Sequence, residues 1–147
     1  MAGIFKAYDI RGIYGETFDG EIVFKIGRAF VTFLKCRKVV VGRDMRSHST
    51  EVFDALAKGL TMQGADVIDL GLCSTPMSYF ANGRLQADAG IMITASHNPA
   101  EWNGLKLCRE KAIPISGATG IQDIERIAAA ETFDSPPAEP GKVTSYD

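Results

Sequence analysis

A serine and a lysine ten residues apart are the residues of this chain best suited to chemistry. Ser96 opens the polar run Ser96-His97-Asn98-Pro99, directly after an apolar segment, and Lys106 follows a second polar turn. A hydroxyl beyond the carboxyl end of a buried strand stands on a rigid support, where open α/β sheets bind their ligands. Asn-Pro stops the strand and forces a turn. The plain alternative is a hydrophilic connection between two strands.

Further polar side chains follow the carboxyl ends of the predicted strands. They are Tyr8, Asp9, Arg11, Arg43, Arg46, Ser74, Thr75, His97 and Asn98. Parallel strands bring their carboxyl ends to one edge of a sheet, so these side chains would face a common crevice. Guanidinium groups, a lysine and hydroxyls supply the charge and the donors that a phosphate needs. Ser96 is then either a phosphate-binding hydroxyl or a covalent phosphoryl carrier.

Several of these residues also have a structural interpretation. Arginines in a loop before a helix often pair with a nearby carboxylate, so Arg43 and Arg46 could hold their loop in shape through Asp44. Ser74-Thr75 fits a helix cap, with Pro76 at the first helical position. His97 could cap the turn instead of contacting a phosphate.

Composition limits the class of protein. The chain has 147 residues, 46% hydrophobic and 23% charged, which is typical of one globular domain with its own core. Its net charge of −2 offers no general attraction to nucleic acid or to an anionic membrane. The wide spacing of Cys36, Cys73 and Cys108 argues against disulfides and a zinc site and favours small buried side chains. With no signal peptide or membrane-spanning stretch, we expect a cytoplasmic protein.

Strands and helices alternate along the sequence. The predicted elements are a strand at 4–10, a helix from Gly20 capped by Asp19, a strand at 38–42, a helix from a Ser49 cap to Gly64, a strand at 65–71, a helix opened by Ser74-Thr75-Pro76, a strand at 89–94, an antiparallel hairpin of 104–108 and 111–115, and a helix at 116–131. This order predicts a three-layer α/β/α domain with a mixed, mostly parallel sheet.

The last residues differ from the rest. Ser135-Pro-Pro-Ala-Glu-Pro140-Gly141 cannot continue a helix or a central strand. We therefore predict a domain at 1–131 and a Pro-rich linker at 132–147.

Several common nucleotide-binding and hydrolase signatures are absent. The sequence has no Walker A motif, no Gly-x-Gly-x-x-Gly after a strand and no Gly-x-Ser-x-Gly. Four motifs instead resemble, in their order, those of the α-D-phosphohexomutase family, especially its phosphomannomutase/phosphoglucomutase branch. They are Tyr8-Asp9-Ile10-Arg11-Gly12, Gly42-Arg43-Asp44-x-Arg46, Ser74-Thr75-Pro76, and Thr94-Ala-Ser96-His97-Asn98-Pro99 followed by Asn103-Gly104-Leu-Lys106.

The resemblance implies an isomerase that interconverts hexose 1-phosphates and 6-phosphates of mannose or glucose. Ser96 would be the phosphoserine, Lys106 the general base, and His97 and Arg11 would steady the transferring group. Tyr8 would line the substrate cleft, and Asn98 belongs to the phosphoserine motif that meets the substrate. The resemblance also implies Mg²⁺, held in part by the phosphate on Ser96, and a bisphosphorylated hexose as activator.

This sequence also departs from the family pattern. The Asp-Gly-Asp-x-Asp motif that supplies the other magnesium ligands is missing, as are the sugar-recognition and phosphate-binding loops of the later domains. We therefore expect domain I alone, inactive without domains II to IV and prone to self-association near the hairpin and the last helix. The alternatives are a stand-alone binding or assembly module with the same fold, or a member of the phosphoglucosamine mutase branch.

Overall fold

The computed structural model describes residues 1 and 3–146, and within them the strands form a single six-stranded mixed sheet. The strands are β1 (Ile10–Ile13), β2 (Lys38–Arg43), β3 (Asp66–Leu72), β4 (Ala89–Ile93), β5 (Trp102–Arg109) and β6 (Val143–Ser145), in the order β1-β5-β4-β2-β3-β6. The adjacent strands β4, β2, β3 and β6 run parallel to one another, whereas β5 is antiparallel to both β4 and β1. The mixed sheet was predicted.

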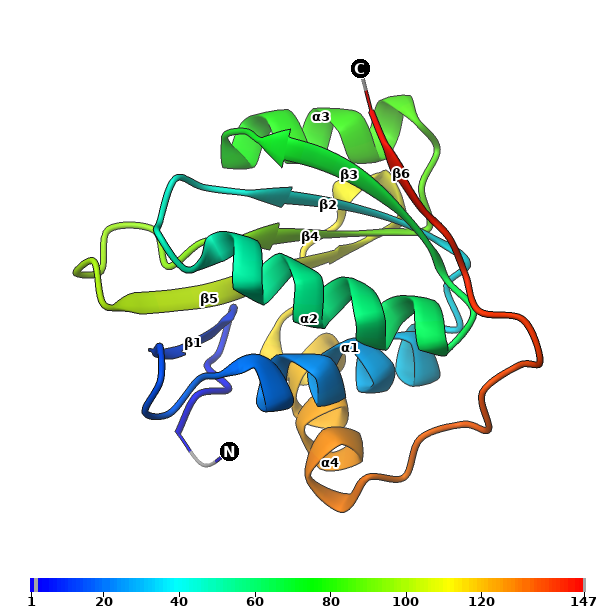
Figure 1. The fold of residues 1–147 in the computed structure, drawn as a ribbon, viewed down its shortest axis with the longest axis horizontal. Coiled ribbons are helices and arrows are strands. Elements are labelled where there is room, and N and C mark those ends of the chain that lie inside the picture. The colour runs from blue at the N-terminus through cyan, green and yellow to red at the C-terminus, as the bar shows by residue number, and fades with distance from the viewer. Residues whose placement is uncertain (2, 147) are drawn as a thin grey trace.

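Helices cover both faces of this sheet, as predicted for three α/β/α layers. They are α1 (Gly20–Leu34), α2 (Ser49–Met62), α3 (Thr75–Arg84) and α4 (Gln122–Ala130). Helices α1 and α2 lie on one face with α4 against α1, and α3 lies on the other face (Figure 1). No helix among residues 1 and 3–146 has the length and apolar character needed to cross a membrane.

The first two helices pack closely because glycines face each other at their crossing. A Cβ atom on Gly59 would lie 2.3 Å from the carbonyl oxygen of Phe24, and one on Gly27 would lie 2.9 Å from that of Leu56. Asp19 caps α1, as predicted, by accepting a hydrogen bond from the backbone N–H of Ile22 at 2.9 Å.

Of the caps predicted for the next two helices, that of α2 is wrong and that of α3 is confirmed. Ser49 is the first residue of α2, not its cap, because its hydroxyl donates to the carboxylate of Asp44 at 2.8 Å. Ser74 does cap α3, accepting from the N–H of Met77, and Pro76 occupies the second helical position.

The predicted first strand at 4–10 is wrong. The segment folds back on itself, since Lys6 N–H donates to the carbonyl of Asp9 at 2.8 Å and Arg11 N–H to that of Ile4 at 2.9 Å. Strand β1 then starts at Ile10 and continues through Arg11 and Gly12, although Arg-Gly is a sequence that favours turns. Pairing with β5 outweighs the turn preference of Arg-Gly.

The predicted hairpin of 104–108 and 111–115 is confirmed only in part, because its second segment pairs with the first but forms no strand of its own. Strand β5 pairs with β4 and β1, and Glu110–Ala112 form a short 3₁₀ turn with left-handed backbone at Lys111 (φ 61°) and Ala112 (φ 56°). An antiparallel bridge joins Cys108 to Pro114, flanked by bonds from Arg109 N–H to the carbonyl of Ile113 and from Ile115 N–H to that of Leu107, both at 2.9 Å. The loop that contains Ser96 makes a further antiparallel connection, between β4 and β5.

The helix predicted at 116–131 begins with a different turn. Residues Gly117–Ile121 form a wide π-type turn. A capping box between Ser116, just before the turn, and Thr119, within it, stabilises its start, and α4 follows from Gln122.

Residues 132–146, predicted as part of a linker, are attached to the domain. The guanidinium of Arg28 lies 4.2 Å from the ring centre of Phe133, and Gly141 N–H donates to the carbonyl of Thr61 at 2.8 Å. Strand β6 then pairs with β3, because Val-Thr-Ser follows the last proline. The role of this segment as a linker stays a prediction, and Asp147 lies outside the described residues.

The three cysteines are free thiols, as predicted, with Cys36 and Cys108 buried and Cys73 partly exposed. Burial raises the pKa of Cys36 to about 12 and that of Cys108 to about 11. These two thiols are therefore neutral near pH 7 and serve as small core side chains.

Candidate functional site

The loop between β4 and β5 exposes Ser96 on the surface of the domain. Strand β4 is fully buried, whereas Ser96 and His97 are exposed. Ser96 has a left-handed backbone (φ 57°), which is costly for a residue with a side chain, and its N–H donates to the hydroxyl of Thr94 at 3.0 Å. A strained residue with an exposed hydroxyl on a rigid strand end is the arrangement expected of a reactive serine.

Other contacts fix the turn that follows. The side-chain amide of Asn98 donates to the carbonyl of Ala95 at 2.7 Å, and its backbone N–H donates to the same oxygen at 3.1 Å. Asn98 is thus a structural residue of the loop, and its predicted contact with substrate is not tested by these bonds.

Arg11 and Lys106 project from the same face of the sheet beside this loop. Arg11 pairs with Gly104 in the β1–β5 ladder, and a Cβ on Gly104 would lie 2.8 Å from Cγ of Arg11, so the arginine side chain crosses over this glycine. Lys106 is two residues further along β5, opposite Met92, and side chains two apart share a face. The two cations therefore stand next to each other near the end of β4.

Their surroundings differ. Arg11 Nε forms an ion pair with Asp9 at 3.0 Å, which orients the guanidinium and leaves its outer nitrogens accessible. Among residues 1 and 3–146, Lys106 makes no side-chain hydrogen bond or ion pair, so its amine is free for a ligand. Tyr8, 80% exposed, lies in the turn that precedes β1. The structure thus gathers Ser96, Arg11 and Lys106 at one edge of the sheet.

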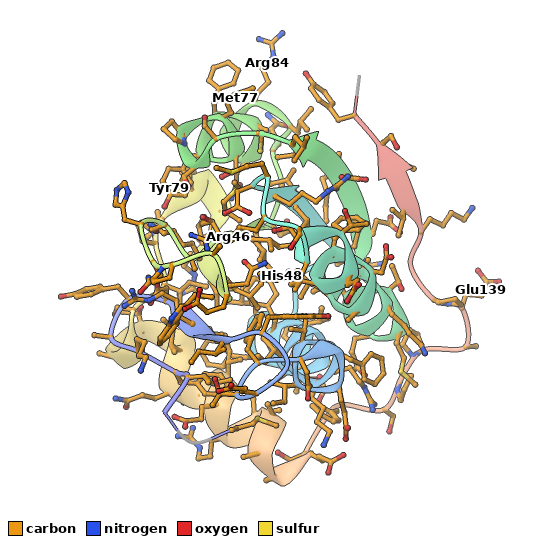
Figure 2. The ribbon with its side chains drawn as sticks, turned by 60° about the vertical axis from the view of Figure 1, so that its left-hand side comes forward. Arg46, His48, Met77, Tyr79, Arg84 and Glu139 are labelled. Atoms are coloured by element: carbon orange, nitrogen blue, oxygen red, sulfur yellow. The ribbon has the colours of Figure 1, made fainter. Side chains whose placement is uncertain are left out.

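Arg43, the last residue of β2, and Arg46, in the loop that follows, have separate partners. Arg43 pairs with Asp69 of β3 at 2.9 Å and lies 5.2 Å from the ring centre of Phe53, so the predicted pairing with Asp44 is wrong for this residue. Arg46 does pair with Asp44, at 3.1 Å, and lies in the interior next to the Ser96 loop (Figure 2). Arg43 is thereby directed away from the candidate site.

A buried hydrogen-bond network at the β5 end of the Ser96 loop was not predicted from the sequence. The amide nitrogen of Asn103, which is fully buried, lies 2.8 Å from Nδ1 of His48 and 3.1 Å from the hydroxyl of Ser49. Because that amide is the donor to Nδ1, His48 carries its proton on Nε2 and donates it to the carbonyl of Ala100 at 3.2 Å. No sequence signal links residues 55 positions apart.

Tyr14 packs on this network. Its ring stacks on His48 with centres 4.6 Å apart, and its hydroxyl donates to the carboxylate of Glu51 at 2.6 Å. This hydrogen bond to an anion raises the pKa of Tyr14 to about 12, so the phenol stays protonated and holds the histidine ring in place.

The site contains few groups that could bind a metal. Within residues 1 and 3–146, no three His, Cys, Asp or Glu side chains are placed to hold an ion together. The chain itself does not supply a complete metal centre there.

Comparison with known proteins shows the family of this domain. Residues 2–135 match the family model described as "Phosphoglucomutase/phosphomannomutase, alpha/beta/alpha domain I". A phosphomannomutase of Klebsiella pneumoniae is 51% identical over 138 residues, which cover 94% of this chain and 87% of that protein. One from Escherichia coli is also 51% identical over 138 residues, but the match covers only 30% of its length.

A solved structure gives the same result. A phosphoglucomutase/phosphomannomutase family protein of Burkholderia thailandensis superimposes with a TM-score of 0.88 at 37% identity, covering 98% of this chain and 33% of that one. The match is close in both fold and sequence. The chain belongs to the phosphoglucomutase/phosphomannomutase family and corresponds to its α/β/α domain I.

Proposed function

We propose that Ser96 carries the phosphoryl group in a phosphohexomutase that interconverts the 1-phosphates and 6-phosphates of mannose or glucose. The observation that supports this most is the Ser96 loop itself, with a strained backbone, an exposed hydroxyl and two cations on the adjacent sheet face. A loose phosphoryl-transfer transition state is stabilised mainly by positioning and by nearby positive charge. The relatives named phosphomannomutase favour the same activity.

Each residue has a role in this scheme. A hydroxyl oxygen of the hexose phosphate attacks the phosphorus on Ser96, the bond from phosphorus to the serine oxygen breaks, and Lys106 takes the hydroxyl proton. Arg11 and His97 stabilise charge on the transferring group, and Tyr8 lines the cleft. Transfer back from the other end of the bisphosphorylated sugar restores the phosphoserine.

The proposal includes Mg²⁺, for which this chain would supply one ligand. The phosphate on Ser96 offers a hard oxygen, which suits Mg²⁺. Because the described residues provide no acidic cluster beside it, we assign no step of the reaction to the metal within this chain.

The matched E. coli relative is much longer than this chain, which spans about 30% of it. We propose that sugar recognition and the remaining metal ligands come from the part of such relatives that has no counterpart here. The chain alone is then inactive and relies on domains equivalent to II–IV. The cytoplasmic location, the hexose phosphate partner and self-association of the isolated domain remain predictions.

An exchange of domains tests this proposal. We call the joined enzyme the protein in which this chain replaces the matching segment of the E. coli phosphomannomutase. We expect it to convert mannose 1-phosphate to mannose 6-phosphate in a coupled assay with Mg²⁺ and a bisphosphorylated hexose, whereas the 147-residue chain alone shows no comparable turnover.

Two results would count against the proposal. A joined enzyme that is folded by circular dichroism, yet inactive on mannose and glucose phosphates, favours the stand-alone binding or assembly module. Activity confined to glucosamine 1-phosphate would move the chain to the phosphoglucosamine mutase branch.

A further inference from the structure

All N–H donors of the Arg46 guanidinium are hydrogen-bonded, either to the Ser96 loop or to the carboxylate of Asp44. A guanidinium has five N–H groups. In Arg46, Nε donates to Asp44 at 3.1 Å, and the two terminal nitrogens donate to four backbone carbonyls at 2.7–3.1 Å. Those carbonyls belong to Ser96, Asn98, Pro99 and Trp102. The side chain is 11% exposed.

This saturation excludes Arg46 as a phosphate ligand. Every donor already has an acceptor, and a phosphate could take a donor only by breaking one of the bonds that hold the loop. The four carbonyls run from Ser96 itself to the first residue of β5, so a single planar group connects both ends of the loop. Lysine has three donors on one flexible ammonium and cannot reproduce this pattern.

Asp44 attaches the guanidinium to the rest of the domain. Its carboxylate also accepts from the backbone N–H of Arg46 at 3.1 Å and from the hydroxyl of Ser49 at 2.8 Å. Its backbone N–H donates to the carbonyl of Ile93, the last residue of β4, at 3.0 Å. The loop after β2 is thereby joined to the strand that carries Ser96.

We propose that Arg46 is a positioning residue, which holds Ser96 in its left-handed conformation with the hydroxyl outward. The bond to the Ser96 carbonyl fixes the peptide group next to the strained residue, and the other three bonds prevent the loop from relaxing. Arg46 then controls how fast Ser96 gains a phosphoryl group without touching that group. This kinetic part rests on the function proposed above, and the conformational part does not.

Amide hydrogen exchange on the 147-residue chain tests the conformational part. In Arg46→Lys we expect the amides of Ser96, Asn98 and Trp102, which are bonded within the loop, to exchange about tenfold or more faster, with Met92 of β4 unchanged. Arg43→Lys is the matched control, because it weakens a similar ion pair on β3 and should leave the loop amides unchanged. Equal exchange in Arg46→Lys and wild type would overturn the proposal.

Chemical rescue separates positioning from general stability. In Arg46→Ala, millimolar methylguanidinium should restore slow exchange of the loop amides, whereas methylammonium, with the same charge but no planar fork, should not. Restoration by both cations, or by neither, would contradict the positioning role. If the alanine variant does not fold, the lysine variant decides alone.

The kinetic part is measured by incubating the joined enzyme with glucose 1,6-bisphosphate and Mg²⁺, followed by intact-mass analysis. We expect Arg46→Lys to gain phosphate at least about tenfold more slowly than wild type and Arg43→Lys to match wild type. Equal rates in all three proteins would refute the kinetic role. A joined enzyme that gains none would refute loading of Ser96 and, with it, the kinetic role, while the exchange experiment still decides the conformational role.

Discussion

Replacing Ser96 with alanine lowers turnover of the joined enzyme by at least about a thousand-fold, because no other described hydroxyl stands at this position to carry the phosphoryl group. The variant should fold normally, since the Ser96 side chain is exposed. Conversion of mannose 1-phosphate, followed in a coupled assay, measures the effect. The thermal midpoint measured on the same samples separates lost chemistry from lost structure.

Ser47→Ala is the matched control for that experiment. Ser47 is an exposed serine in the adjoining loop after β2, next in sequence to Arg46. Its replacement should leave turnover within about twofold of wild type. If Ser96→Ala kept most of the activity, or if Ser47→Ala lost it to the same degree, the assignment of the phosphoryl carrier would be wrong.

Lys106→Met should lower turnover about a hundredfold or more, because it removes the amine that accepts the hydroxyl proton and that, once protonated, offsets negative charge near Ser96. Methionine keeps the unbranched stem that lies along β5, so we expect little change in the free energy of unfolding. The turnover number of the joined enzyme at saturating substrate is the quantity to measure.

Lys38 offers a comparison at the opposite end of the sheet. It begins β2, and its amine donates to the carbonyl of Leu85 at 3.1 Å, away from the Ser96 loop. Lys38→Met should therefore leave turnover unchanged. An equal loss in the two variants would show that overall charge, not a specific proton acceptor, explains the result.

The sequence predicted those parts of the fold whose signals are local. These signals come from residues close together in the sequence. They are the apolar face of α1 and its Asp19 cap, the buried valines of β2 and the helix cap at Ser74. The position of Ser96 after β4 was predictable for the same reason, since a buried strand ends where Asn-Pro forces a turn.

The errors concern pairing between distant segments. The start of β1 depends on which residues meet β5, and residues 143–145 form a strand only because the edge of β3 is open to them. Arg43 and Arg46 look alike in sequence, yet one meets a carboxylate on β3 and the other reaches the Ser96 loop. Such choices depend on tertiary position, which local propensity does not determine.

The most direct measurement is the location of covalent phosphate on the joined enzyme after incubation with glucose 1,6-bisphosphate and Mg²⁺. Intact-mass analysis gives the number of phosphates, and fragmentation of the peptide that contains residues 94–103 gives their position. We predict a single phosphate on the oxygen of Ser96, absent from Ser96→Ala and retained in Ser47→Ala. A phosphate on another residue, or none on the folded joined enzyme, would contradict the claim that this serine carries the phosphoryl group.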